Sequence, residues 1–117
     1  MRERTYHCPV EVTVDVIGGK WTPVVLAQLK ENDCLRFSQI RRLIPDITEK
    51  MLTQRLRELE QLGIVHRTLV SATPPHVEYA LTAEGRSLAP VLQAMHDWGA
   101  QWATDKRLNL EAVDGLA

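Results

Sequence analysis

The chain has 117 residues, which is about the length of one domain. Its composition is 44% hydrophobic and 25% charged, which is typical of a soluble globular protein. This composition excludes a disordered tail, a collagen-like fibre and a disulfide-rich mini-protein. The 14 Lys and Arg residues nearly balance the 15 Asp and Glu residues, so the formal net charge is −1. A total near zero fits a nucleic-acid partner only if the charge is unevenly distributed.

The two cysteines, Cys8 and Cys34, form no CxxC pair, and the four histidines are scattered along the chain. We therefore predict no metal site and no cofactor. Free thiols indicate a reducing cytoplasm. The N-terminus leads into no long apolar region, and no stretch approaches the roughly 20 apolar residues that cross a bilayer. We expect a cytoplasmic protein without a membrane partner.

In the N-terminal third, the β-branched apolar residues of 9–17 fit either a short strand or a helix, and the glycine pair 18–19 ends the segment. Apolar residues at helical spacing predict a helix over 21–29. Residues 35–37 suit a short strand. Residues 38–44 then predict a second helix, which Pro45 ends.

The clearest helix prediction covers 48–62, where leucines recur every three or four residues. Thr48 suits the N-cap of this helix and Gly63 its C-terminal end. Residues 64–70 and 76–81 are rich in β-branched and alternating apolar residues. They predict two strands joined by a proline-containing loop.

Apolar residues at three- and four-residue steps between 88 and 102 predict a last helix, preceded by Thr82 as N-cap and kinked at Pro90. Two short helices joined by a tight turn and followed by a β-ribbon are the order of a winged helix-turn-helix. We predict an α+β, mostly helical fold with a two-stranded β wing and terminal dimerisation helices. One domain spans 1–117, with its core at about 8–98 and the end of the dimerisation helix and a tail at 99–117.

The charge is unevenly distributed along this fold. Residues 36–67 hold seven basic and four acidic residues, a local charge of +3, whereas the remainder carries −4. An ordinary solvated face is the alternative explanation. The helix at 48–62 favours DNA binding, because about 100° per residue places polar and basic side chains opposite its leucines. The predicted DNA contacts on this outer face are Lys50, Thr53, Gln54 and Arg57.

Further DNA contacts are predicted on the flanking elements. The preceding helix and the cap supply side chains suited to phosphates, although for Arg41 and Arg42 simple solubility is the alternative. The wing tip lacks Lys and Arg, so its contribution is expected to be weaker. These additional predicted contacts are Ser38, Arg41, Arg42, Thr48, Thr73 and His76.

The last helix carries more apolar surface on one face than so small a domain needs. Packing within the monomer is the alternative, more so for Met95 than for Trp102. We predict a homodimer, whose interface includes Val91, Met95, Trp98 and Trp102.

Several motifs together resemble the HxlR-type regulators of the MarR-like superfamily, over about residues 8–98. They are Cys8-Pro9, Ile17-Gly18-Gly19-Lys20-Trp21, the segments 36–38, 43–45, 47–53, 56–60 and 63–67, and the wing residues Pro75, 77–79, 81–82 and 85–86. The resemblance implies a homodimeric bacterial or archaeal transcription factor on a palindromic operator. It also implies that the terminal helices pair across the two-fold axis. Repression is the expected mode of action.

The resemblance also implies a role for Cys8, because in several relatives the cysteine at this position senses quinones, aldehydes or oxidants. A small electrophile or oxidant is then a partner. The chemistry requires an exposed thiol whose pKa is lowered by neighbours such as His7 or a helix N-terminus. The alternative is a small buried side chain at a dimer interface. Cys34 is predicted to be structural.

Two other hypotheses stay open. One is a winged-helix regulator switched by a small-molecule effector bound near the dimer interface. The other is a winged-helix protein-interaction module that does not bind DNA. An enzyme is not predicted, because the sequence shows no Ser/His/Asp order, carboxylate pair, metal cluster or phosphate loop.

Overall fold

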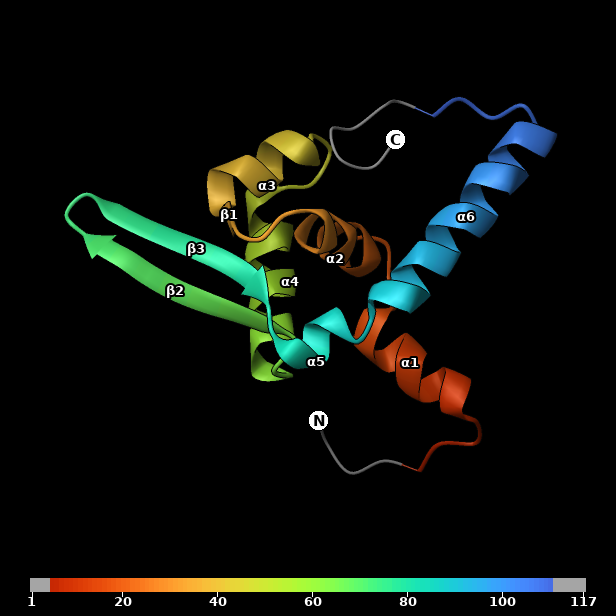
Figure 1. Ribbon diagram of the computed structural model, residues 1–117, viewed down its shortest axis with the longest axis horizontal. Coiled ribbons are helices and arrows are strands. Elements are labelled where there is room, and N and C mark those ends of the chain that lie inside the picture. Colours follow the sequence, from red (N-terminus) through yellow and green to blue (C-terminus); the bar gives the residue numbers. More distant parts are fainter. Residues whose placement is uncertain (1–4, 111–117) are drawn as a thin grey trace.

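The computed structural model describes residues 5–110, and its mostly helical α+β architecture agrees with the prediction (Figure 1). Residues 9–17, for which the sequence left strand and helix open, form a helix. The elements in chain order are α1 (Pro9–Ile17), α2 (Thr22–Glu31), β1 (Leu35–Arg36), α3 (Phe37–Leu43), α4 (Glu49–Gln61), β2 (Val65–Ala72), β3 (Pro75–Leu81), α5 (Ala83–Arg86) and α6 (Ala89–Asp105).

The helix-turn-helix consists of α3, α4 and the turn at 44–48. The Thr48 Oγ1 accepts a hydrogen bond from the Met51 N–H at 3.1 Å, which confirms the predicted N-cap. Gly63 follows α4 with a φ of +76°, a left-handed conformation that favours glycine at the end of a helix. Both ends of α4 are therefore determined by residues next to it in the chain.

The sheet has three strands in the order β1-β3-β2, and both pairings are antiparallel. The predicted two-stranded wing is present, and β1 adds a third strand at its base. Phe37, which was predicted to belong to the short strand, opens α3 instead. The wing strands are longer than predicted, so that the connecting tip is only Thr73 and Pro74. Pairing with the opposite strand extends each strand beyond what its own composition indicates.

The core lies where α2, α3 and α4 pack with the sheet and the start of α6. The largest fully enclosed apolar side chains come from these three helices and the turn between α3 and α4: Val25, Leu26, Leu29, Ile40, Ile47, Leu52, Leu56 and Leu59. Gly85 of α5 lies against this core so closely that a Cβ there would be 2.2 Å from the Ile64 carbonyl oxygen. The Thr82 hydroxyl donates to the Gly63 carbonyl at 2.6 Å and accepts from the Gly85 N–H at 3.0 Å. These contacts hold α5 against the end of α4.

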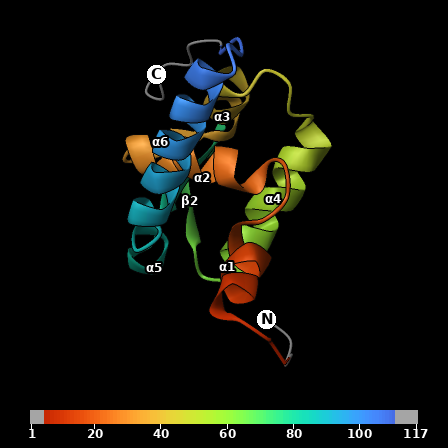
Figure 2. The same ribbon diagram turned by 90° about the vertical axis from the view of Figure 1, so that its right-hand side faces the viewer.

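The predicted kink at Pro90 is wrong. The structure has two helices, α5 and α6, separated at 87–88, and Pro90 lies in the first turn of α6. A proline is tolerated there because the first-turn N–H groups have no partner within the helix. Figures 1 and 2 show α1 and α6 on the side of the molecule opposite the wing. Across residues 5–110, the structure contains no helix with both the length and the apolar content of a membrane span.

Candidate DNA-binding surface

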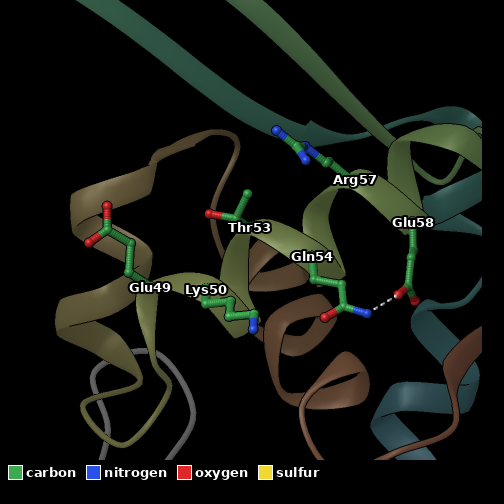
Figure 3. A pocket seen from close by; sticks show the side chains of 6 residues that line it. All are labelled: Glu49, Lys50, Thr53, Gln54, Arg57 and Glu58. Atoms are coloured by element: carbon green, nitrogen blue, oxygen red, sulfur yellow. Dashed lines mark hydrogen bonds between the residues drawn. The ribbon is translucent and has the colours of Figure 1, made fainter.

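Two open hollows adjoin on the surface of α3 and α4, and seven of the predicted DNA contacts line them. Because Glu49 belongs to both hollows, they form one continuous surface. The first hollow, shown in Figure 3, is lined by Glu49, Lys50, Thr53, Gln54, Arg57 and Glu58. The second is lined by Phe37, Ser38, Arg41, Arg42 and Glu49.

The orientation of α4 explains why these side chains face outward. Its leucines at 52, 56 and 59 are fully enclosed in the core. Lys50, Gln54 and Arg57 are exposed, and Thr53 is half-buried beside them. Donors that can reach base edges or phosphates are therefore presented along an exposed side of a well-packed helix.

Two acidic residues on this surface were not among the predicted contacts. Glu49 occupies the first turn of α4, where its charge favours the helix N-terminus. Glu58 accepts a hydrogen bond from Gln54 Nε2 at 3.3 Å and from Arg55 Nη2 at 3.0 Å. The four-residue step from Gln54 to Glu58 is the sequence signal that indicates this pairing.

The predicted DNA contacts at the cap and in the wing differ in whether their polar groups are free to bind DNA. Thr48 uses its hydroxyl oxygen for the cap, which leaves the hydroxyl proton able to donate to a phosphate. Thr73 is exposed at the wing tip. The sequence predicted His76 in the wing tip, but the structure places it half-buried within β3. Its Nδ1 lies 3.5 Å from Arg36 Nη2.

The two cysteines are both exposed free thiols in different settings. Cys8 is the N-cap residue of α1, and its side chain makes no capping hydrogen bond. The hydrogen bond to Glu78 is the main reason why the pKa of Cys34 is raised, and burial and the charges of Glu78 and Asp33 add to it. A raised pKa disfavours the reactive thiolate at Cys34.

The predicted dimer residues form an exposed apolar face on α6. Val91, Met95, Trp98 and Trp102 are all exposed, whereas Leu92 on another side of the helix is buried in the core. The Trp98 and Trp102 rings stack with their centroids 5.0 Å apart. A second apolar face, not predicted from the sequence, lies on α1, where the exposed Val10 and Val14 are four residues apart and share one side of the helix; Val12 is exposed on another side.

Comparison with known proteins agrees with this architecture. The HxlR-like helix-turn-helix family matches residues 16–107. The HTH-type transcriptional regulator YdeP of Bacillus subtilis is 49% identical over 106 residues, which cover 91% of this chain and 81% of YdeP. The structure of the redox regulator HypR in its oxidized form aligns with a TM-score of 0.76 and 45% identity, over 90% of this chain and all of that one. The reduced form of the regulator YodB from B. subtilis aligns with a TM-score of 0.69 and 38% identity, over 82% of this chain and 94% of that one. The chain therefore belongs to the HxlR-like helix-turn-helix family and is a transcriptional regulator.

Proposed function

We propose that this chain acts in the cytoplasm as a homodimer that binds a palindromic DNA operator through the α3–α4 surface and wing of each subunit. The observation that carries the proposal is the convergence of seven predicted contacts from two helices on two adjoining hollows. A dimer seated on a promoter occupies duplex that RNA polymerase needs. Repression is therefore the proposed mode of action.

The chemistry of the surface divides into base contacts and phosphate contacts. Gln54 has the amide that pairs with adenine, and Arg57 and Lys50 suit guanine or the backbone. Thr53 can bind a base edge or a phosphate. The α3 and cap residues Ser38, Arg41, Arg42 and Thr48 suit phosphates, and Thr73 places the wing along the backbone. We therefore assign the reading of base sequence to α4. We assign the positioning of the protein along the duplex to α3 and the wing.

The apolar faces of α6 and α1 support the homodimer. The stacked Trp98 and Trp102 are 66% and 46% exposed. Together they leave more apolar surface in water than a monomer of this size usually does. Pairing of α6 across a two-fold axis covers this surface and brings two α4 helices to one duplex. The two half-sites would be about 34 Å apart, one turn of B-DNA.

The first experiment selects bound duplexes from a random library with the full chain, and then measures binding of the selected palindrome and of a shuffled duplex by fluorescence anisotropy. Gln54→Ala is expected to reduce the preference for the palindrome by about tenfold or more, since a bidentate base contact contributes about 1–3 kcal/mol. Lys50→Ala is expected to reduce it as well. Gln61→Ala is the matched control, because Gln61 is exposed on the same helix but lines neither hollow.

The result that would overturn the proposal is the absence of any duplex preferred over the shuffled one. A protein-interaction module would then be the better explanation of the fold. Equal discrimination by wild type, Gln54→Ala and Lys50→Ala would instead overturn the assignment of base reading to this face of α4. Melting temperatures close to that of the wild type separate both results from misfolding.

A second candidate function is a thiol switch at Cys8. The specific observation is that Cys8 is exposed at the start of α1, directly before the exposed valines of that helix. Modification of the thiol would add bulk beside a surface that we assign to the dimer interface. HypR, which is described as a redox regulator, shares this fold at 45% identity.

The test measures binding of the selected palindrome before and after treatment with diamide or a quinone, in wild type, Cys8→Ser and Cys34→Ser. Wild type and Cys34→Ser are expected to lose binding, and Cys8→Ser is expected to keep it. An equal response of Cys8→Ser and wild type would contradict the switch. A wild type that does not respond would favour a small-molecule effector bound near the dimer interface.

A further inference from the structure

Arg36 occupies the junction between the wing and the helix-turn-helix. It is the last residue of β1, which pairs with β3 of the wing, and it directly precedes α3. The second hollow, with Ser38, Arg41 and Arg42, begins one residue later at Phe37. Arg36 is exposed, and its place in the chain joins the two parts of the surface that we propose for DNA binding.

The neighbours of Arg36 form a chain of polar contacts across the sheet. Arg36 Nη2 lies 3.5 Å from His76 Nδ1, and His76 Nε2 lies 2.9 Å from Glu78 Oε2. A guanidinium can only donate, so a hydrogen bond between the two groups has Nδ1 as its acceptor and leaves the ring N–H at Nε2. That N–H is enclosed beside the Glu78 carboxylate, close to it but without the alignment of a good hydrogen bond.

The charge of Arg36 is not neutralised by this chain of contacts. Glu78 is directly opposite Arg36 in the strand register, yet its Oε2 faces His76 Nε2 at 2.9 Å. Among the residues that the structure describes, Arg36 forms no ion pair with a carboxylate. Its backbone N–H donates to Gln39 Oε1 at 2.8 Å, which holds the start of α3. Within residues 5–110, the guanidinium has a single hydrogen-bond acceptor, His76 Nδ1, for its five N–H groups.

We propose that Arg36 binds a phosphate of the DNA duplex and that His76, with Glu78 behind it, positions the Arg36 guanidinium for this contact. The inference rests on the proposed DNA-binding function and adds a residue to it. It also changes the role of His76, which contacts Arg36 rather than DNA. The phosphate contact links the wing to α3, because Arg36 belongs to β1 at the base of the wing and directly precedes α3.

The test is the salt dependence of binding to the selected palindrome. Loss of one phosphate contact makes the negative slope of log affinity against log salt shallower by about 0.9, so Arg36→Ala is expected to make it shallower by about 1.8 in a dimer. Preference for the palindrome over the shuffled duplex should not change, since a phosphate contact carries no sequence information. Arg36→Gln serves as a second uncharged variant if Arg36→Ala fails to fold. Arg86→Ala is the matched control, because Arg86 is exposed on α5 and lines neither hollow.

The positioning role of His76 is tested by replacement with Gln and Leu. His76→Gln keeps an acceptor for Arg36 and a donor for Glu78, so it should keep the wild-type slope, whereas His76→Leu should make the slope shallower as Arg36→Ala does. The double variant Arg36→Ala/His76→Leu should show no further loss. An unchanged slope in both Arg36→Ala and Arg36→Gln would overturn the phosphate contact. Equal slopes of His76→Gln and His76→Leu would overturn the positioning. Failure of the proposed function is a different result, because the wild type itself would then prefer no duplex.

Discussion

The side-chain amide of Gln54 donates a hydrogen bond to Oε1 of Glu58, one turn further along α4, at 3.3 Å. Glu58 also pairs with Arg55, so its carboxylate is held in place from two sides. Gln54 and Glu58 both line the first hollow, as Figure 3 shows. In the free protein, the amide that we assign to base reading is therefore already bound to a neighbour, and it must leave Glu58 to reach DNA.

Glu58→Ala is expected to raise the affinity for the selected palindrome several-fold. The variant removes an i,i+4 pair of about 0.2–0.5 kcal/mol that competes with the base contact. It also removes a negative charge from a surface that faces phosphates. Anisotropy titrations measure the change. Glu60→Ala is the control for charge alone, since Glu60 is exposed on α4 but outside the hollow. Equal gains from both variants would contradict a restraint on Gln54 by Glu58.

Trp98→Ala is expected to weaken the homodimer. Truncation of a buried aromatic anchor typically costs about 2 kcal/mol or more at an interface, which corresponds to roughly 30-fold in the dissociation constant of the dimer. Sedimentation velocity over a range of concentrations measures this constant. Gln101→Ala tests an exposed neighbour on α6 that we place outside the interface. If Trp98→Ala and Gln101→Ala dimerise alike, α6 does not form the interface through its tryptophans.

Glu78→Gln is expected to lower the pKa of the Cys34 thiol toward its ordinary value. The carboxylate of Glu78 accepts the thiol hydrogen bond and repels the thiolate, and both effects raise the pKa. The rate of alkylation by iodoacetamide as a function of pH, in a Cys8→Ser background, reports the thiolate fraction. The midpoint should move to lower pH in Glu78→Gln and by less in Asp33→Asn, because Asp33 is the weakest of the influences on this thiol. A larger shift in Asp33→Asn would show that the hydrogen bond to Glu78 is not the main cause.

Gln28→Met is expected to stabilise the protein. Gln28 is 0% exposed in α2, and neither Oε1 nor Nε2 of its amide has a hydrogen-bond partner among the described residues. A buried unpaired amide costs about 1–3 kcal/mol, and methionine has a similar shape without that cost. The free energy of unfolding in urea should therefore rise by about 1 kcal/mol. Gln61→Met at an exposed position should stay within about 0.5 kcal/mol of wild type. A destabilised Gln28→Met would mean that an ordered water satisfies the amide.

The candidate site shows where local information is sufficient. The cap at Thr48, the leucine stripe of α4 and the glycine at 63 act within a few residues of one another, so the length of α4 and its outer face are predictable. The Gln54–Glu58 pair follows from the same periodicity. The apolar face of α1 was not predicted, because a β-branched segment suits a strand and a helix equally well until its neighbours are known.

The sequence by itself determined the family, the order of helix-turn-helix and wing, and the face of α4 that carries Lys50, Gln54 and Arg57, because these depend on motifs and on spacing along one helix. Only the tertiary structure decided where α5 lies, because the Thr82 hydroxyl bonds to the Gly63 carbonyl and Gly85 packs against the Ile64 carbonyl, both at the far end of the wing in sequence. It also decided the surroundings of His76, since β1 and β3 are 40 residues apart at the contact with Arg36 and pair only in the folded chain. Local spacing cannot predict a contact between segments so distant in sequence.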